Sequence, residues 1–258
     1  MVNVSEGRRT DVIAALAAAA GDHCLDVHSD ADHHRSVFWL AGPRVEDAAR
    51  ALATTAVRTL DIHDHQGVHP RIGVLDVVPF VPVAPPSTME DALGARNAFA
   101  AWAGSELRLP CFLYGPERTL PQVRRGAFRT LHPDAGPPEP HPTAGAAAVG
   151  ARGPLVAYNL WLARPDIETA QLIARELRSE SVRALALVVG DHVQVSCNLI
   201  APTVIGPAEI YDAVAARTDI ARAELVGLIG ADVLGRIDPA RWAQLDLGEN
   251  RTLEARLP

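Results

Sequence analysis

Residues 61–73 of this 258-residue chain carry the side chains best suited to chemistry. The segment reads Asp-Ile-His-Asp-His-Gln-Gly-Val-His-Pro-Arg-Ile-Gly, so three histidines (His63, His65 and His69), two aspartates and Arg71 lie in one short stretch. A simple connection between two elements needs no such residues, whereas loops held by a rigid scaffold are where catalytic and binding groups gather. The segment is therefore the first candidate for a functional site.

The residue types of this segment fit three kinds of chemistry. Its histidines and aspartates could satisfy one another and the backbone in a polar loop, since buried polar groups need partners. His63, His65 and His69, with an aspartate, could supply three or four ligands to a metal ion such as zinc. A histidine oriented by a carboxylate could instead act as a general base, because its pKa lies near neutrality. The residue types and their spacing leave all three open.

Proline and glycine restrict how the chain passes through the segment. Pro70 fixes its own φ and biases His69 towards an extended backbone. Gly67 and Gly73 permit a close approach of backbone or ligand that a side chain would prevent. The segment joins a predicted helix to a predicted strand, and these two elements must hold it in place.

Apolar periodicity and turn residues predict the elements around this segment. Ser87-Thr88-Met89-Glu90 has the spacing of a capping box and so predicts the start of a helix. Strand, helix, strand, strand, helix and strand follow one another, which is the split β-α-β or ferredoxin-like order with an extra helix and strand. The predicted strands are 2–4, 24–27, 36–41, 72–83 and 111–114, and the predicted helices are 8–20, 45–60 and 87–107.

The second half of the chain predicts another small α/β unit. Residues 132–142 are dense in proline and glycine and are the best candidate for a linker. Strands are expected at 155–162, 184–189 and 193–199, helices at 167–178 and 208–216, and a short tail after them. We place the domain boundary near Arg152, giving domains 1–152 and 153–258.

The composition excludes several classes of protein. With 24 basic residues, 31 acidic ones and a net charge of −7, the chain is a poor nucleic-acid or anionic-membrane binder. All its basic side chains are arginine, which excludes Schiff-base chemistry on lysine. No apolar stretch reaches the ~20 residues of a membrane span. Three distant cysteines, Cys24, Cys111 and Cys197, have no metal-binding spacing and indicate free thiols in a reducing cytoplasm.

The longer stretch from His65 to Val83, His-Gln-Gly-Val-His-Pro-Arg-Ile-Gly-Val-Leu-Asp-Val-Val-Pro-Phe-Val-Pro-Val, resembles the H-x-G-x-HPR-x-G-x-x-DV-x-PF-x-P signature of the glutamate formimidoyltransferase family. Other segments resemble the family's motifs in the same order, so that the resemblance covers almost the whole chain. These segments are residues 3–8 (Asn-Val-Ser-Glu-Gly-Arg), 25–37, 133–137 (Pro-Asp-Ala-Gly-Pro), 145–152 (Gly-Ala-Ala-Ala-Val-Gly-Ala-Arg), 156–159 and 223–228.

The resemblance implies a cytoplasmic enzyme that moves a formimino group from N-formimino-L-glutamate to N5 of tetrahydrofolate, which is the acceptor substrate. It also implies an α+β fold of two ferredoxin-like α/β subdomains with a ligand groove between them, and a homodimer. Small-molecule substrates, with no nucleic acid, membrane or metal ion, are the expected partners. The carboxyl-terminal subdomain is shorter than is usual in the family.

The resemblance also assigns roles to residues of this chain. His69 corresponds to the family's general base, with Arg71 expected beside it. His28 stands where the family has a catalytic-site aspartate, so Asp30, or alternatively Asp32, is expected to take that role. Arg71 and Arg35 are candidates for holding carboxylates, because a guanidinium grips a carboxylate through two parallel hydrogen bonds. The expected folate- and substrate-binding residues are Asn3, Glu6, Arg35, His65, Gly136, Pro137, Gly145 and Asn159.

Four positions depart from the family's pattern, namely His28, His34, Arg129 and Trp161. These departures leave a second reading open, a folate-binding homologue that has lost or changed the transfer activity. The third reading is a metal-dependent hydrolase that uses His63, His65 and His69 as ligands. Asp76 is expected either to hydrogen-bond the motif loop or to bind substrate.

Overall fold

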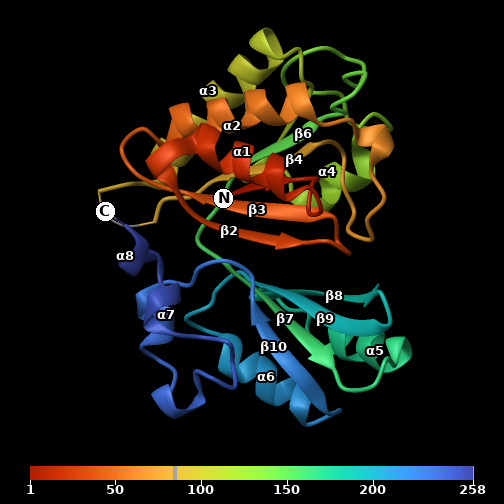
Figure 1. Cartoon of the computed structure of the whole chain (residues 1–258), viewed down its shortest axis with the longest axis vertical. Coiled ribbons are helices and arrows are strands. Elements are labelled where there is room, and N and C mark those ends of the chain that lie inside the picture. Colours follow the sequence, from red (N-terminus) through yellow and green to blue (C-terminus); the bar gives the residue numbers. More distant parts are fainter. Residues whose placement is uncertain (84–85, 258) are drawn as a thin grey trace. The chain divides into compact units, whose positions relative to one another are not determined.

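The computed structural model describes residues 1–83 and 86–257. The last residue of the expected second domain, residue 258, lies outside this part, as do residues 84 and 85. The chain divides into two compact units, Met1–Gly153 and Pro154–Pro258 (Figure 1).

The first unit contains a six-stranded mixed sheet in the order β2-β3-β1-β4-β6-β5. Strands β2, β3, β1 and β4 pair antiparallel, whereas β4, β6 and β5 run parallel. The strands are β1 (Val2–Val4), β2 (Cys24–Asp30), β3 (Arg35–Leu40), β4 (Leu75–Phe80), β5 (Cys111–Tyr114) and β6 (Ala147–Ala151), and the helices are α1 (Thr10–Ala20), α2 (Val45–Thr59), α3 (Met89–Glu106) and α4 (Leu120–Gly126).

Helices cover both faces of this sheet. Figure 1 shows α1, α2 and α3 on one side, where Leu16, Leu52 and Phe99 pack with the strands in the larger core. Helix α4 packs on the other face through Val123. Because successive side chains of a strand point to opposite faces, the β4 strand contributes to both cores. A strand buried on both sides explains why every residue of β4 except Asp76 is apolar.

Two elements of the first unit were not predicted. Strand β6 has the sequence Ala-Ala-Val-Gly-Ala, which carries little β propensity. Its small side chains are required where it lies, because a Cβ on Gly150 would lie 2.1 Å from the Tyr114 ring. Helix α4 is short and begins with a capping box of Thr119 and Gln122. The capping box of α3 is formed by Thr88 and Asp91, one residue later than predicted.

Residues 132–142 do not connect the two units, contrary to the sequence-based interpretation. This segment is hydrogen-bonded into the first unit, where the Cys111 amide donates to the Ala135 carbonyl at 2.9 Å. The amide of Ile62 donates to the carbonyl of Thr143, the residue that follows this segment, at 2.7 Å, and this bond supports the start of the motif loop. The units meet in sequence between Gly153 and Pro154.

The second unit contains a four-stranded antiparallel sheet in the order β10-β7-β9-β8. Helices α5 and α6 pack on one face, with Tyr158 and Leu160 in the core. Strand β10, with its alternation of small and charged residues, was not predicted. The elements are β7 (Val156–Leu162), α5 (Ile167–Leu177), β8 (Val182–Val189), β9 (His192–Leu199), α6 (Pro207–Ala215), β10 (Ile220–Leu225), α7 (Ala231–Leu234) and α8 (Leu253–Arg256).

The two units share one order of elements. Each begins with strand, helix, strand, strand, helix and strand, and each sheet places the fourth of these strands beside the first, then the third and then the second. The fold is therefore α+β with interleaved helices, as the sequence predicts. Within the described residues, no helix is both long and apolar enough to cross a membrane.

Candidate functional site

The motif loop, residues 61–73, lies between α2 and β4 and packs against the turn that joins β2 to β3. The Val68 amide donates to the Asp32 carbonyl at 3.4 Å. The closest approach is at Gly67, where an added Cβ would lie 2.4 Å from the His33 carbonyl oxygen and 2.8 Å from the His34 Cβ. Glycine is therefore the residue that fits, because any side chain would push the loop away from the turn.

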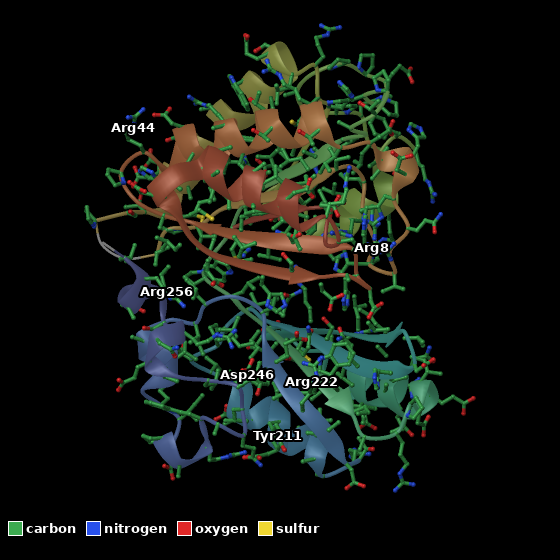
Figure 2. The ribbon with its side chains drawn as sticks, viewed as in Figure 1. Arg8, Arg44, Tyr211, Arg222, Asp246 and Arg256 are labelled. Carbon is green, nitrogen blue, oxygen red and sulfur yellow. The ribbon has the colours of Figure 1, made fainter. Side chains whose placement is uncertain are left out.

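Arg8 ties the motif loop to the same turn. Its Nε donates to the Ala31 carbonyl at 2.8 Å, and its NH2 group donates to the Gln66 carbonyl at 3.0 Å. Figure 2 shows the Arg8 side chain beside the end of the β2–β3 hairpin. One guanidinium thus bridges two segments that are far apart in the sequence.

Arg71 organises the loop from within. Its guanidinium donates to the carbonyls of Gly67, at 3.0 Å, and of His69, to which Nε lies at 3.1 Å. Its NH1 group lies 2.7 Å from Nε2 of His65, which also lies 2.7 Å from the His34 carbonyl. Nε2 accepts from Arg71 in one tautomer of His65 and donates to His34 in the other. The structure therefore places Arg71 on the loop backbone rather than on a carboxylate.

The two ring nitrogens of His69 differ in their contacts: Nδ1 is hydrogen-bonded to the backbone, and Nε2 is left to accept a proton. Nδ1 lies 2.8 Å from the Pro70 carbonyl, and because a carbonyl only accepts, Nδ1 must carry the hydrogen. Nε2 then has the lone pair, and no hydrogen bond to it is found in residues 1–83 and 86–257. The orienting group is a backbone carbonyl, not the carboxylate that the residue types suggested.

The surroundings of His69 favour the neutral imidazole. Burial lowers its pKa, and the nearby guanidinium groups of Arg35 and Arg124 lower it further. Asp76 and the Pro70 carbonyl act in the opposite direction, but the pKa still falls to about 3. At neutral pH the ring is therefore uncharged, and Nε2 can accept a proton.

Asp76 is the charge centre beside His69. Its side chain is completely buried, and its Oδ2 accepts from Arg35 at 2.5 Å and from Arg124 at 2.8 Å. Oδ1 accepts from the Ile72 amide at 2.9 Å, which fixes the end of the motif loop on β4. Although burial raises the pKa of Asp76, the two guanidinium groups lower it below its usual value. Asp76 thus accepts a hydrogen bond from the motif loop, which was one of the two roles expected for it from the sequence.

Arg124 was not identified from the sequence. It extends from α4, donates to Asp76 and also donates to the Pro70 carbonyl that holds His69. Arg124 lies on α4, a short helix that was not predicted, and it is 54 residues from Pro70 in the sequence. No local spacing could therefore have indicated this contact.

Asp30 organises the β2–β3 turn. Its carboxylate accepts from the amides of Asp32, at 2.9 Å, and His33, at 2.7 Å, and it contacts Nδ1 of His33 at 2.9 Å. Burial raises its pKa, but these hydrogen bonds outweigh burial and lower the pKa to about 2. The His33 ring lies 6.2 Å from the His69 ring, centroid to centroid. Asp30 therefore reaches the site through His33 and stays ionised.

Glu6 lies behind the motif loop and is completely buried. It accepts from the amides of Arg8 and Arg9 at 2.9 and 3.0 Å, and from the Arg9 guanidinium at 2.5 Å. Burial raises its pKa, yet the hydrogen bonds lower it overall. A cavity of about 280 Å³ adjoins Glu6, lined by Ser5, Glu6, Arg8, Arg9, His34, Leu60, Asp61, Asp64 and His65.

Asn3, another predicted binding residue, lies on β1, where its Nδ2 donates to the Val77 carbonyl at 3.5 Å.

The three histidines of the loop do not converge on one point. His63 is exposed and its Nδ1 lies 2.7 Å from Asp61. His65 contacts Arg71, and His69 contacts Pro70, so each ring has a separate partner. Among the residues that the structure describes, no three His, Cys, Asp or Glu side chains are close enough to hold a metal ion together. The geometry therefore gives the metal-dependent hydrolase no support.

The glycines expected to contact folate have structural reasons of their own. Gly136 has φ +85° and packs against the Leu109 carbonyl. Gly145 has φ +68°, exchanges backbone hydrogen bonds with His141, and leaves no room for a Cβ beside the Ile72 carbonyl. Pro137 is half-buried. These contacts shape the segment between α4 and β6 whether or not it binds a ligand.

Asn159 lies in the second unit, on β7. Its Nδ2 donates to Oε2 of Glu224 at 3.1 Å, and the Trp161 indole donates to the same oxygen at 2.8 Å. The Arg222 guanidinium, labelled in Figure 2, stacks 4.2 Å from the Trp161 ring centroid. Trp161 is thus built into a polar cluster on the sheet, together with the residue predicted to bind substrate.

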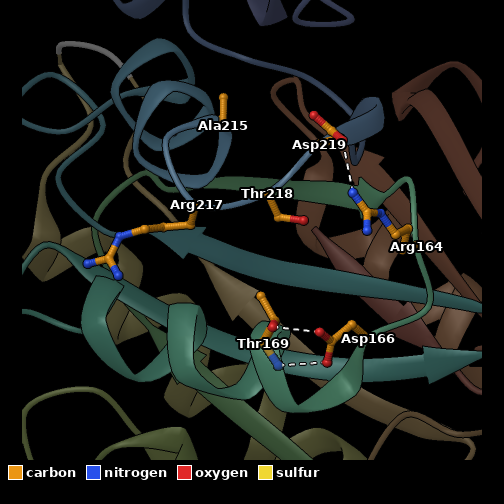
Figure 3. A pocket seen from close by; sticks show the side chains of 7 residues that line it. All are labelled: Arg164, Asp166, Thr169, Ala215, Arg217, Thr218 and Asp219. Atoms are coloured by element: carbon orange, nitrogen blue, oxygen red, sulfur yellow. Dashed lines mark hydrogen bonds and ion pairs between the residues drawn. The ribbon is translucent and has the colours of Figure 1, made fainter.

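The second unit also has a surface pocket of about 450 Å³ at the end of β7 (Figure 3). Asp166 there caps α5 through the Thr169 amide and hydroxyl, at 2.9 and 2.6 Å. Arg164 and Asp219 face each other at 3.7 Å and are mostly exposed. No predicted site residue is among those that line the pocket, which are Arg164, Asp166, Thr169, Ala215, Arg217, Thr218 and Asp219.

Comparison with known proteins identifies the family. Residues 1–152 match the profile described as "Formiminotransferase domain, N-terminal subdomain". The chain belongs to the formiminotransferase family. It is 36% identical to the glutamate formimidoyltransferase of Streptococcus pyogenes serotype M1 over an alignment of 275 positions, which covers 96% of this chain and 90% of the relative. The glutamate formimidoyltransferase of Thermoplasma acidophilum is 33% identical, and the alignment covers 93% of this chain and 89% of that protein.

The formiminotransferase relatives also include longer proteins. The formimidoyltransferase-cyclodeaminase of Gallus gallus is 37% identical over 199 residues, which cover 69% of this chain but 36% of that protein. The chain therefore spans nearly the full length of the two microbial formiminotransferases and a minor part of the vertebrate one. It is homologous to enzymes over nearly all of its length.

The departures from the formiminotransferase pattern lie in different elements of the fold. His34 is in the β2–β3 turn with φ +49°, and its ring packs edge-on against His65 with centroids 4.1 Å apart. Arg129 is exposed. Trp161 belongs to the second unit, and His28 lies on β2 opposite Val37. His34 therefore contacts the motif loop itself.

Proposed function

We propose that this protein transfers the formimino group of N-formimino-L-glutamate to N5 of tetrahydrofolate, with His69 as the general base. Family membership supports the reaction, and the geometry of His69 supports the role of the residue. Nδ1 donates to Pro70, and Nε2 carries an unengaged lone pair on a neutral ring. This orientation is the observation on which the proposal depends.

The reaction needs one proton to move between two nitrogens. N5 attacks the formimino carbon, the electron pair of its C=N bond moves to the imino nitrogen, and Nε2 of His69 takes the proton from N5. The tetrahedral intermediate collapses when the C–N bond to glutamate breaks and Nε2 passes the proton to the departing nitrogen. The C=N bond forms again, and the products are 5-formiminotetrahydrofolate and glutamate. A single imidazole can act as base and then as acid.

The remaining residues would position the substrates. Arg35, with Asp76 holding it, faces the site and can bind a carboxylate of the donor. Arg71 would act by ordering the backbone that presents His69, since its guanidinium binds two carbonyls of the loop. Asp30 would act through His33. The roles of Asn3, Glu6 and His65, and of Gly136, Pro137, Gly145 and Asn159 in folate binding, stay predictions.

The larger assembly also stays a prediction. We propose that the two units are ferredoxin-like subdomains, residues 1–152 and a shortened carboxyl-terminal subdomain, residues 153–258. A cytoplasmic homodimer without a bound metal completes the proposal.

The direct test mixes the protein with tetrahydrofolate and formiminoglutamate and follows the formation of 5-formiminotetrahydrofolate. The variant His69→Ala should lower the rate by about 10²- to 10⁴-fold, the usual contribution of a general base, while folate affinity falls little. The matched control is His63→Ala, because His63 is exposed and its ring contacts Asp61. It should keep the wild-type rate, whereas a metal site built on the three histidines requires both variants to fail.

A folate-binding homologue with a changed donor is the second candidate. The observation in its favour is Trp161, whose indole shares Glu224 with Asn159 and so alters a predicted substrate-binding position. Tight folate binding with no turnover of formiminoglutamate would establish this candidate and refute the first. Turnover that is lost in His69→Ala would do the reverse.

A further inference from the structure

Two guanidinium groups share a single carboxylate oxygen in the first unit. Arg35 and Arg124 both donate to Oδ2 of Asp76, at 2.5 and 2.8 Å. No second carboxylate contacts either arginine within the described part of the chain. Two positive charges and one negative charge leave the cluster with a net charge of about +1.

This cationic cluster is accessible but not freely solvated. The side chains of Arg35 and Arg124 are 13% and 18% exposed, whereas Asp76 is fully buried. Each guanidinium has five N–H donors, of which the contacts above use only a part. A planar guanidinium with spare donors in a partly dry setting is the group that binds a carboxylate most strongly.

One backbone carbonyl, that of Pro70, connects the cluster to His69. The Pro70 oxygen accepts from Nδ1 of His69 and also from NH1 of Arg124. A carbonyl that already binds a guanidinium is a weaker partner for an imidazolium, because its lone pairs are drawn towards the fixed positive charge. Anything that neutralises Arg124 therefore strengthens the hydrogen bond that stabilises protonated His69.

We propose that Arg35 and Arg124 form a carboxylate-binding subsite, and that a carboxylate bound there raises the proton affinity of His69. The inference rests on the proposed role of His69 as a base. His69 is then a poor base in the free protein and an effective one when the donor's carboxylate is in place. The substrate itself completes the catalytic group.

The balance of the groups around His69 keeps its pKa low in the ligand-free protein, as this proposal requires. Burial and the two arginines together lower the pKa of His69 to about 3, while Asp76 opposes them. The other neighbours are the His33 ring at 6.2 Å and the Arg71 guanidinium on the His69 carbonyl. An opposite charge within about 4–6 Å commonly shifts a pKa by 1–3 units, so a bound carboxylate should raise it by about that amount.

The test is an NMR titration of the histidine rings in the full chain, with the His69 signal assigned through His69→Gln. Saturating glutamate should raise the apparent pKa of His69 by about 1–3 units, and glutarate should do the same. Glutaramide, which has the same length but no charge, should leave it unchanged. A pKa of His69 that is the same with and without glutamate would overturn the proposal, and an equal shift with inorganic phosphate would overturn its assignment to carboxylates.

Variants separate the subsite from general effects of charge. Arg124→Gln should raise the pKa of His69 in the ligand-free protein and remove most of the shift caused by glutamate. Arg124→Lys, which keeps the charge, should keep the low ligand-free pKa. The matched control is Arg125→Gln, an exposed neighbour on α4, which should change neither value. Equal behaviour of the Arg124 and Arg125 variants would refute the link through Pro70.

The titration uses neither folate nor turnover, so its failure differs from that of the proposed function. A protein that shows the glutamate-dependent shift but transfers no formimino group keeps the subsite and loses the reaction. A protein that transfers the group while His69 is indifferent to glutamate keeps the reaction and loses this inference.

Discussion

Gly67→Ala should disable the motif loop without unfolding the protein. An alanine Cβ at this position would lie 2.4 Å from the His33 carbonyl oxygen and 2.8 Å from both the His34 Cβ and the His65 Cε1. Two of these atoms belong to the β2–β3 turn and one to the loop itself. The loop can therefore relieve the overlap only by moving away from the turn.

The size of the movement follows from these distances. Ordinary contacts of a Cβ begin near 3.4 Å, so the backbone must open by about 1 Å at its closest point. His69 follows two residues later, and a displacement of about 1 Å in a reacting group can cost about 10²-fold in rate. Overpacking of this kind costs about 1–3 kcal/mol of stability, which a domain of this size can tolerate.

The assay compares the initial rate of 5-formiminotetrahydrofolate formation with the urea unfolding midpoint of the same variant. Gly94→Ala is the matched control, because a Cβ on this glycine of α3 meets nothing within 4 Å. It should keep the rate and gain up to about 1 kcal/mol, since alanine is the better helix former. Gly67→Ala that folds and keeps a rate within threefold of wild type would show that the close packing of the loop does not position His69.

Three further predictions concern stability and reactivity. Asp76→Asn should lower the free energy of unfolding by about 3 kcal/mol at pH 7, measured by urea unfolding, because it leaves two guanidinium groups without their counter-charge. Since the pKa of Asp76 is lowered in the folded protein, its contribution to stability is present above pH ~4. The difference in stability between the variant and the wild type should therefore narrow as the pH falls below that value. Thr88→Ala should cost about 1 kcal/mol and Ser87→Ala almost nothing, because Thr88 forms the cap of α3. With a thiol reagent at pH 8, the half-buried Cys24 should react in the native protein, whereas the buried thiols of β5 and β9, whose pKa values are raised to about 12 by burial, should react only on unfolding.

The apolar patterns of helix α2 and strand β5 predicted both elements closely. The helix expected at 45–60 is α2, Val45–Thr59, and the strand expected at 111–114 is β5, Cys111–Tyr114. These segments have an apolar pattern that depends only on their own sequence. Strand β6 lacked such a signal, because its place between two parallel strands demands small residues instead of β-branched ones.

The candidate site was predictable as far as its residues were neighbours in sequence. The loop with His69, and Asp76 shortly after it, could be found from composition and motif alone. Arg124 could not, because its proximity to Pro70 arises from the packing of α4 on the sheet. Nor could the sequence show that Arg71 would turn back onto its own loop.

The nature of the group that orients His69 has a consequence for the chemistry. A carboxylate on Nδ1 would stabilise the imidazolium and give a base that is active before substrate binds. Here the carboxylate, Asp76, offsets one of the two positive charges of Arg35 and Arg124, and an uncharged carbonyl holds the ring. On the proposed mechanism the free protein therefore lacks the negative charge that proton transfer to His69 needs. A formimino donor with carboxylates of its own supplies that charge, so that binding at the arginines and activation of the base become one event.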